Sequence, residues 1–542
     1  MSMRPLAGPH IQMDATDIEA QTAGRREWIA LAVIALPCLL YSMDLSVLYL
    51  ALPSLTADLK PSGAQLLWIS DIYGFMLAGF LITMGTLGDR IGRRRLLLIG
   101  AAMFGIASVL AAFANSVAML IAARALLGVA ASTLAPSTLS LIRNMFLDPR
   151  QRTIAIGIWV TSFSAGAALG PALGGLLLQF FWWGSVFLIA VPVMVLVLVL
   201  GPVLLPEFRD PKASRFDLVS AALSLVAVLA MVYGVKKLAE NGFGPVPAVS
   251  FLVGSAVGLA FLRRQQKLAE PLVDLRLFRR PAFTGALTAN TLSLFLIFGT
   301  FFLVAQYLQL VLGFSPLRAG LWSVPSSLGF IAGSLLLAPA LLRRHGAGMT
   351  MTYGLAVAAI GLLLLTQLPG SGGHGLALTL VGSSLLALGV SPVVTLATDL
   401  IVGAVPPEQA GQASGLSETG TELGGALGIA LLGSITTAVY RSQLPDALPA
   451  GVQVQTLSDA ARSAASLPDR VGAPLLGSAR EAFAQGLHLA AIVSAVLAVL
   501  LAVLAATVLR RRPAAEENGT RPVDSARGHA QLVPLAEPCG DS

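Results

Sequence analysis

Charged residues are scarce in this 542-residue chain: Asp, Glu, Lys and Arg together make up 12% of it. Soluble domains carry about 25% charge, so most of this chain needs an apolar surrounding. Because 56% of the residues are hydrophobic and fall in runs along the whole chain, disordered, coiled-coil and collagen-like classes are excluded, as is a soluble enzyme with a single membrane anchor. The runs are continuous, whereas strands of a transmembrane β-barrel alternate apolar and polar residues.

Cysteine and histidine are also rare. The two cysteines, Cys38 in an apolar run and Cys539 in a polar tail, indicate no disulfide framework. None of the five histidines pairs with another at metal-ligand spacing, so we expect no metal site and no cofactor. The sequence has no Walker A motif, which argues against ATP-driven pumping.

Apolar runs of about 20 residues, the length that crosses a bilayer, predict fourteen transmembrane helices. An even number of spans places both termini on one side. If that side is the cytoplasm, most of the 35 Lys and Arg residues fall in its loops and tails, as the positive-inside rule requires. The net charge of +7 is therefore explained by membrane orientation, and we expect no nucleic-acid partner.

The predicted helices fall into two similar halves. Glycines recur at the same spacing in both halves, and Arg90 and Gly92 align with Arg344 and Gly346. Repeated halves with a substrate site between them are typical of secondary transporters. We therefore predict five segments: a cytoplasmic N-tail (1–27), a six-helix bundle (28–205), two inserted helices with their loops (206–282), a second six-helix bundle (283–509) and a disordered cytoplasmic C-tail (510–542). The second bundle contains an external loop at 439–484.

The first motif lies on the predicted cytoplasmic turn between helices 2 and 3. It reads Gly85-Thr-Leu-Gly-Asp89-Arg90-Ile-Gly92-Arg93-Arg94-Arg95. Gly92 permits a tight turn, and Asp89 could meet a helix N-terminus or an Arg of a neighbouring element. The motif resembles the signature turn of the major facilitator superfamily, which implies the major facilitator fold and a gating role for these residues.

The second motif, in predicted helix 5, has glycine at every fourth position. Its residues are Gly166, Gly170, Pro171, Gly174 and Gly175. Such spacing lets another helix backbone approach closely, so ordinary helix packing is one interpretation. Together with the first motif it resembles the antiporter signature of drug:proton exporters.

A third motif, Met43-Asp44-Leu-Ser46-Val-Leu-Tyr49-Leu-Ala-Leu-Pro53, lies in predicted helix 1. It resembles the helix-1 signature of the fourteen-helix drug:proton antiporters, although Ser46 replaces the usual Thr and Tyr49 the usual Asn. The resemblance covers residues 28–509 and implies multidrug efflux, as in exporters of quaternary ammonium compounds. Some members of the family that this chain resembles have a further acid on helix 10 that assists divalent cations; that place falls near Phe330 in this chain, which favours monovalent cations.

Ionisable residues inside predicted spans are candidates for transport because an acid at a helix centre costs about 2.5–3.5 kcal/mol to insert. Six such residues occur: Asp44, Asp71, Arg124, Asp399, Glu418 and Glu422. Glu418 and Glu422 share one helix face and would repel each other if both were ionised, which suits a proton carrier. Asp71 could be interfacial and Asp399 could lie at the surface. Arg124 matches the family's helix-4 motif, which implies a link to proton transfer.

These observations favour a proton-coupled antiporter that exports lipophilic cations. Tyr41, Tyr73, Phe163, Trp159 and Phe330 could offer cation–π faces. A dedicated exporter of a self-made metabolite or antibiotic is an alternative, and a membrane-embedded enzyme is a remote one. We expect a monomer in the inner membrane of a bacterium, with both termini cytoplasmic and with protons, lipid and a small lipophilic substrate as partners.

Overall fold

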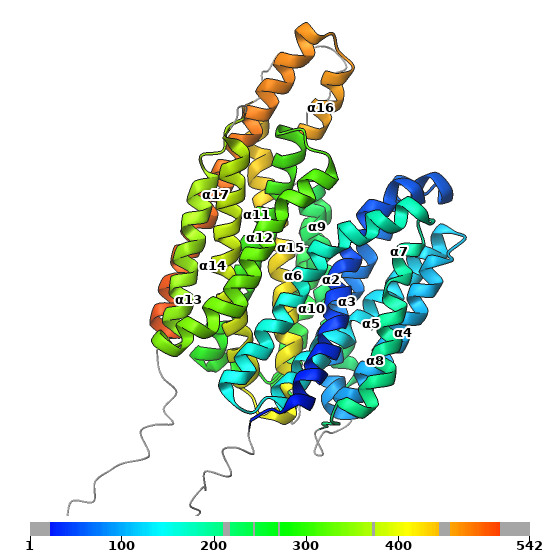
Figure 1. Ribbon diagram of the computed structural model, residues 1–542, viewed down its shortest axis with the longest axis vertical. Coiled ribbons are helices and arrows are strands. Elements are labelled where there is room, and N and C mark those ends of the chain that lie inside the picture. The colour runs from blue at the N-terminus through cyan, green and yellow to red at the C-terminus, as the bar shows by residue number, and fades with distance from the viewer. Residues whose placement is uncertain are drawn as a thin grey trace, which may run out of the picture. The chain divides into compact units, whose positions relative to one another are not determined.

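The computed structural model describes residues 22–209, 217–241, 244–268, 271–370, 374–443 and 456–509 (Figure 1). Every regular element in these ranges is a helix. Twelve segments are long and apolar enough to cross a membrane. The prediction of an all-α integral membrane protein is therefore confirmed. The tail at 510–542 and residues 444–455 of the predicted external loop lie outside the described residues.

The N-terminal half consists of long helices joined by short turns. Several begin at residues whose side chains accept a hydrogen bond from the first helical turn: Ser62, Ser116 and Asp148. The helices are α2 (Arg25–Leu59), α3 (Gly63–Ile91), α4 (Arg93–Ala112), α5 (Val117–Met145), α6 (Pro149–Phe180), α7 (Ser185–Leu188) and α8 (Ala190–Leu204).

Two further helices, α9 (Leu218–Asn241) and α10 (Pro245–Lys267), pack on each other and precede the second half. α9 also contacts α3 and α15. The C-terminal half contains η1 (Leu275–Arg279), α11 (Pro281–Gln306), η2 (Tyr307–Val311), α12 (Pro316–Ala332), η3 (Gly333–Leu337), α13 (Ala338–Leu365), α14 (Gly375–Gly403), η4 (Pro407–Gln409), α15 (Ala410–Ser442), α16 (Leu457–Ala465) and α17 (Asp469–Val508).

The two halves repeat the same helix pairings. α2 packs on α6 as α11 packs on α15, and α4 packs on α5 and α8 as α13 packs on α14 and α17. Gly92 and Gly346, which the sequence aligned, both have positive φ, at 111° and 77°. Glycine adopts this conformation without the steric cost that other residues incur. The internal repeat is therefore visible in the structure as well as in the sequence.

The predicted count of fourteen spans differs from the twelve segments found by length and composition. One of the twelve, Arg318–Leu365, is 48 residues long, and α13 within it has non-helical backbone at Gly346. α6 has 32 residues but is not among the twelve. If α6 crosses the membrane and the chain turns at Gly346, fourteen spans result, so the higher count remains a prediction.

Both ends of the described chain, near residues 22 and 509, lie at the lower end of the helices in Figure 1. We call this the terminal end and the opposite one the distal end. At the distal end α16 packs on the beginning of α17, with Leu457, Ala460 and Ala464 buried. Segment 456–480 thus forms a helical hairpin.

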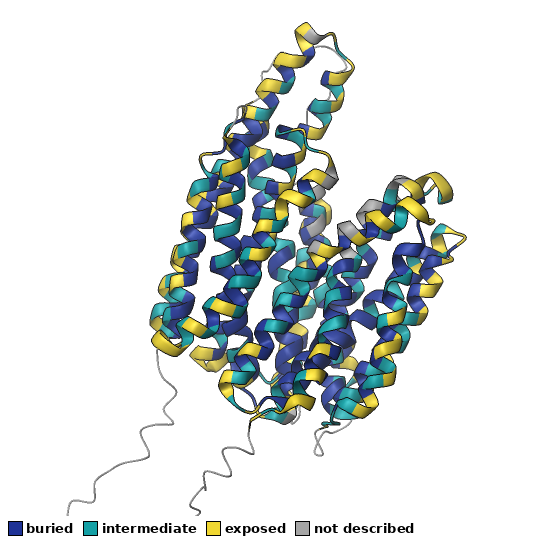
Figure 2. Cartoon of the chain, in the orientation of Figure 1, coloured by how far each residue is buried: buried dark blue, intermediate teal, exposed yellow. Residues whose placement is uncertain are grey.

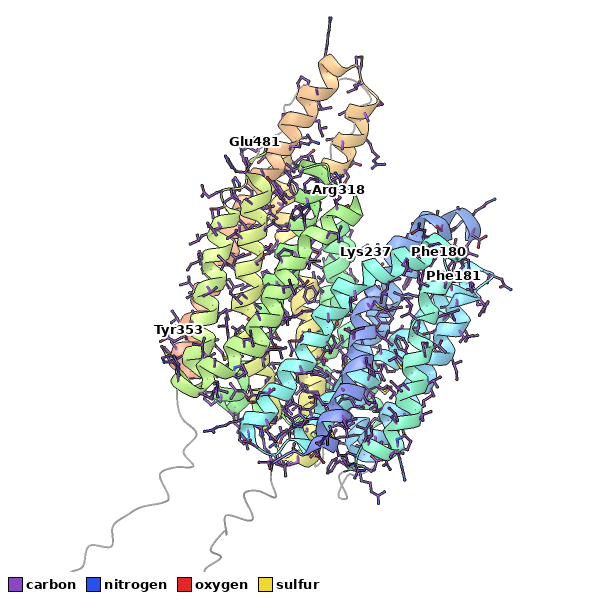
Figure 3. The ribbon with its side chains drawn as sticks, in the orientation of Figure 1. Phe180, Phe181, Lys237, Arg318, Tyr353 and Glu481 are labelled. Carbon is purple, nitrogen blue, oxygen red and sulfur yellow. The ribbon has the colours of Figure 1, made fainter. Side chains whose placement is uncertain are left out.

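Large apolar side chains are exposed along the sides of the helices, where Figure 2 shows exposed residues on the outer surface. On α10, for example, Leu252 is 70% exposed. This pattern suits helices that face lipid. At the distal end, Figure 3 shows Phe180 and Phe181 where α6 ends and the charged Lys237 and Arg318 near the ends of other helices.

Candidate functional site: buried acids and a latch between two bundles

The terminal end carries a charged contact between the two halves. Asp89, at the end of α3, accepts hydrogen bonds from the backbone N–H groups of Gly411 at 3.0 Å and Gln412 at 2.9 Å. These N–H groups belong to the first turn of α15, whose positive dipole end favours a carboxylate. The close approach of the helices depends on glycine, because a Cβ on Gly85 would lie 2.3 Å from the Gly411 carbonyl oxygen.

Arg93 completes this contact. Its guanidinium donates to Asp89 Oδ1, at 2.7 Å from Nη2 and 3.0 Å from Nε. The same Nη2 also donates to the Pro407 carbonyl of the second half, at 2.5 Å. Arg93 is 1% exposed. We call Asp89, Arg93 and the first turn of α15 the α15 latch.

Arg94 and Arg95 of the same motif contact the segment that follows α8. The Arg94 backbone N–H donates to Glu207 Oε1 at 3.2 Å, and the Arg94 and Arg95 side chains lie 3.6 Å and 3.8 Å from Glu207 Oε2. These contacts stay within the first half. Arg90 is half-buried at the end of α3. The motif is therefore divided between a contact across the halves and contacts that hold α4 to the segment after α8.

A second charged contact at the terminal end joins α6 to α14. Arg152 Nε donates to Asp399 Oδ1 at 2.6 Å, and Thr153 Oγ1 donates to Oδ2 at 2.8 Å. Sequence reasoning assigned Asp399 to the surface and did not single out Arg152. The available signal was a basic residue in the first turn of one helix and an acid in the last turn of another on the same predicted side. We call this contact the α14 latch.

Asp44 and Arg124 form a buried ion pair within the first half. Arg124 Nη1 donates to Asp44 Oδ2 at 2.5 Å, and its Nε donates to the Ile69 carbonyl at 3.3 Å. The Arg124 side chain is fully buried, and its guanidinium lies 4.7 Å from the centre of the Tyr73 ring. The structure therefore brings together two sequence candidates from α2 and α5, and each neutralises the other's charge.

Glu422 of α15 contacts the other half through a tyrosine. The Tyr41 hydroxyl of α2 donates a hydrogen bond to Glu422 Oε1. Glu418, one helical turn earlier, is 6% exposed and makes no hydrogen bond to any residue in the described ranges. A buried carboxyl group without a hydrogen bond is costly when charged. Glu422 is therefore held by the opposite half, whereas a bound proton or cation would offset the cost of burying a charged Glu418.

Aromatic side chains of the first half surround Tyr41. The Tyr41 ring centre lies 5.4 Å from Phe163 and 6.3 Å from Tyr73, and Phe163 lies 4.8 Å from Trp159. Four of the five aromatic residues proposed from the sequence thus form one cluster, and one of its members contacts Glu422. The fifth, Phe330, lies on α12 and is 8% exposed. Sequence reasoning did not link Tyr41 to a glutamate.

Asp71 is a half-buried residue of α3. Within the described ranges, no group of three or more His, Cys, Asp or Glu residues could hold a metal ion.

The glycine motif of α6 lies against α2. A Cβ on Gly166 would lie 2.1 Å from the Leu39 carbonyl oxygen, and one on Gly174 would lie 3.0 Å from a methyl group of Val47. Gly170 is buried, whereas Gly175 is exposed with nothing within 4 Å of its added Cβ. The side chain of Pro171 lies outside the described residues. The motif therefore sets how closely α6 approaches α2, the helix that carries Tyr41 and Asp44.

A repeated helical bundle with charged groups between its halves is typical of membrane transporters. Residues 34–429 match the Major Facilitator Superfamily. The chain belongs to this family and is a multi-pass membrane transporter, not an enzyme.

Several curated relatives match nearly end to end. The multidrug efflux pump LfrA of Mycolicibacterium smegmatis is 45% identical, covering 90% of this chain and 97% of its own. The methyl viologen resistance protein SmvA of Salmonella typhimurium is 36% identical over 84% and 93% of the two chains. The tetracenomycin C resistance and export protein of Streptomyces glaucescens is 32% identical over 90% and 93%.

Solved structures support the fold. The crystal structure of the human organic anion transporter MFSD10 (TETRAN) is similar with a TM-score of 0.55 and 17% identity, covering 88% of this chain and all of that one. At this identity the likeness concerns the fold alone.

Proposed function

We propose that the chain is a proton-coupled antiporter that exports lipophilic cations across the inner membrane of a bacterium, with the terminal end in the cytoplasm. The observation that carries the proposal is the contact between Glu422 and Tyr41, because it places an acid of one half against an aromatic cluster of the other. Relatives named for multidrug efflux and methyl viologen resistance support export as the direction.

The chemistry of the site suits cations. Asp44 already has Arg124 as its charged partner, so Glu418 and Glu422 are the acids that can respond to a substrate. A cation beside them favours their ionised form and expels a proton, and protonation in turn expels the cation. The aromatic cluster around Tyr41 supplies cation–π faces. Phe330 on α12 falls near the place where some relatives that this chain resembles carry a further acid that assists divalent cations, and this favours monovalent cations.

Proteoliposomes with a pH gradient test this function. We expect the wild-type protein to exchange tetraphenylphosphonium, a monovalent lipophilic cation, for protons. This exchange should dissipate the pH gradient, which an enclosed pH-sensitive dye reports. Glu418→Gln and Glu422→Gln proteins should behave like protein-free liposomes. Protein-dependent movement of the cation without proton movement would contradict the proposed coupling.

A dedicated exporter of a self-made antibiotic is the second candidate. The similarity to the tetracenomycin C resistance and export protein favours it. A susceptibility panel separates the two: protection against many unrelated lipophilic cations supports multidrug efflux, whereas protection against one compound class supports a dedicated exporter.

A further inference from the structure

A line of buried hydrogen bonds joins the inserted helices α9 and α10 to the α15 latch. Gln265, near the end of α10, donates from Nε2 to Ser220 Oγ of α9 at 2.8 Å. Its Oε1 accepts from the backbone N–H groups of Leu272 at 2.7 Å and Val273 at 3.3 Å. Gln265 is 2% exposed. One side chain thus holds Leu272 and Val273, which belong to the connecting segment 271–274 before η1.

The line continues into α15 through Gln412. Gln412 Nε2 donates to the Leu272 carbonyl at 2.7 Å, and the Gln412 backbone N–H donates to Asp89 Oδ2 at 2.9 Å. The connecting segment therefore holds the Gln412 side chain, and the Gln412 backbone in turn binds Asp89 of the α15 latch. Buried amides are costly to leave without partners, so each member of the line constrains the next.

An ion pair supports the beginning of this line. Arg264 of α10 donates from Nε to Asp217 Oδ2 at 3.0 Å and from Nη2 to Oδ1 at 3.1 Å. Burial raises the pKa of Asp217, but hydrogen bonds from Ser220 and the charge of Arg264 outweigh it, so the pKa lies below the ordinary value. Arg264 also donates from Nε to Ser220 Oγ at 3.2 Å, but within the described residues it makes no hydrogen bond to the segment 271–274, so it serves as a control for loosening of α9 against α10.

We propose that Gln265 and Gln412 are positioning residues of the α15 latch, and that the inserted pair α9–α10 sets the strength of this latch through them. The inserted helices then do more than fill space beside the bundles. The proposal rests on movement between two arrangements of the halves, as the proposed function does, but not on a substrate or on proton coupling.

The separation of the terminal ends measures the latch directly. Spin labels at Arg150→Cys on α6 and Arg344→Cys on α13, in a background with Cys38→Ala and Cys539→Ser, report the fraction of molecules with separated terminal ends. The measurement uses the full chain without substrate or gradient. Its failure is therefore distinguishable from a failure of the proposed antiport.

Replacing either glutamine should release the latch. We expect Gln265→Leu and Gln412→Leu to raise the separated fraction roughly two- to tenfold, as the loss of a hydrogen bond would. Gln265→Glu keeps the oxygen that accepts from Leu272 and Val273 but cannot donate to Ser220, so it should raise the separated fraction less than Gln265→Leu does. Gln412→Glu cannot donate to the Leu272 carbonyl and should behave like Gln412→Leu. A melting curve in detergent verifies that each variant is folded.

Combined variants separate a positioning role from general loosening. In an Asp89→Asn background, Gln265→Leu should raise the separated fraction little further, because both changes act on the α15 latch. In an Asp399→Asn background, which affects the α14 latch, Gln265→Leu should have its full effect on the separated fraction. Arg264→Gln loosens α9 against α10 without touching the connecting segment and should change the separated fraction less than Gln265→Leu. The proposal is overturned if Gln265→Leu leaves the fraction unchanged, is additive with Asp89→Asn, or is matched by Arg264→Gln.

Discussion

Arg124 carries a fully buried charge whose neutralisation depends on Asp44. Removing one member of such a pair leaves an uncompensated charge and costs about 3–5 kcal/mol, whereas replacing both members by apolar residues is often close to neutral. Stability and function can therefore be separated at this pair.

The double variant Asp44→Leu/Arg124→Met should melt closer to the parent than Asp44→Leu or Arg124→Met alone. Because we propose that this charged pair takes part in transport, we expect all three variants to lose cation transport. Thermal unfolding in detergent and transport in proteoliposomes provide the two measurements. A double variant less stable than both single variants would show that the ion pair contributes net stability, and retained transport would remove the pair from the site.

The Tyr41–Glu422 hydrogen bond is the second feature at the residue scale. Tyr41→Phe removes the hydroxyl but keeps the ring that packs on Phe163 and Tyr73. Because a hydrogen bond to a charged group contributes about 1.5–3 kcal/mol, we expect Tyr41→Phe to slow transport about ten- to a hundredfold. The double variant with Glu422→Gln should be little slower than the slower single variant. Independent effects in this double-mutant cycle would mean that the contact does not matter for transport.

Which site residues the sequence could predict depends on their chemistry. Asp44, Glu418 and Glu422 were identifiable because an acid in an apolar run needs an explanation. Tyr41 was not linked to Glu422, since a tyrosine in a membrane helix is unremarkable and the two residues are 381 positions apart. For a similar reason Arg152 was missed and Asp399 was assigned to the surface: each looks like an ordinary surface charge until the fold places them together.

At the scale of elements, glycine packing repeats between the halves. Gly166 of α6 lies against the Leu39 carbonyl, and Gly424 of α15 lies against the Thr291 carbonyl; in both cases an added Cβ would lie 2.1 Å from the oxygen. The sequence predicted that glycines recur in the two halves, but it paired Gly166 with Gly420, so the two backbone contacts lie one helical turn apart in the repeat. It could not predict the contacted carbonyls, which depend on how the helices are turned.

Gly166→Ala and Gly424→Ala should each destabilise the protein by about 1–3 kcal/mol, because the contacted atom is backbone and the helices must move apart. Gly175→Ala is the matched control on α6, since its added Cβ meets nothing within 4 Å. Melting temperatures in detergent should fall for the first two and stay at the parental value for the control. An equal fall in all three would indicate that helix flexibility, not packing, is what the alanine changes.

At the scale of the whole transporter, the hydrogen bonds described between the two bundles concentrate at the terminal end. The α15 latch and the α14 latch lie there, and Ser334 of the second bundle donates to the Gly157 carbonyl of the first at 3.1 Å. The ribbons of the bundles diverge toward the distal end (Figure 1). In the proposed orientation, which places the terminal end in the cytoplasm, this arrangement is closed to the cytoplasm.

Locking the terminal end should therefore stop transport. Ser140 of α5 and Ser414 of α15 lie in different bundles with their Oγ atoms 3.5 Å apart, so Ser140→Cys/Ser414→Cys in the cysteine-free background should cross-link under oxidation. We expect transport in proteoliposomes to fall to background when the disulfide forms and to return when a reductant breaks it.

The matched control is a cross-link within one bundle. Ser326 of α12 and Ser383 of α14 have their Oγ atoms 2.7 Å apart, and both helices belong to the second bundle. If the bundles move as units against each other, Ser326→Cys/Ser383→Cys should transport equally well oxidised or reduced. Loss of transport in both oxidised proteins would mean that motion inside the second bundle is also needed. Transport in the oxidised Ser140→Cys/Ser414→Cys protein would mean that the terminal end need not open at all, and alternating access through the two latches would be wrong.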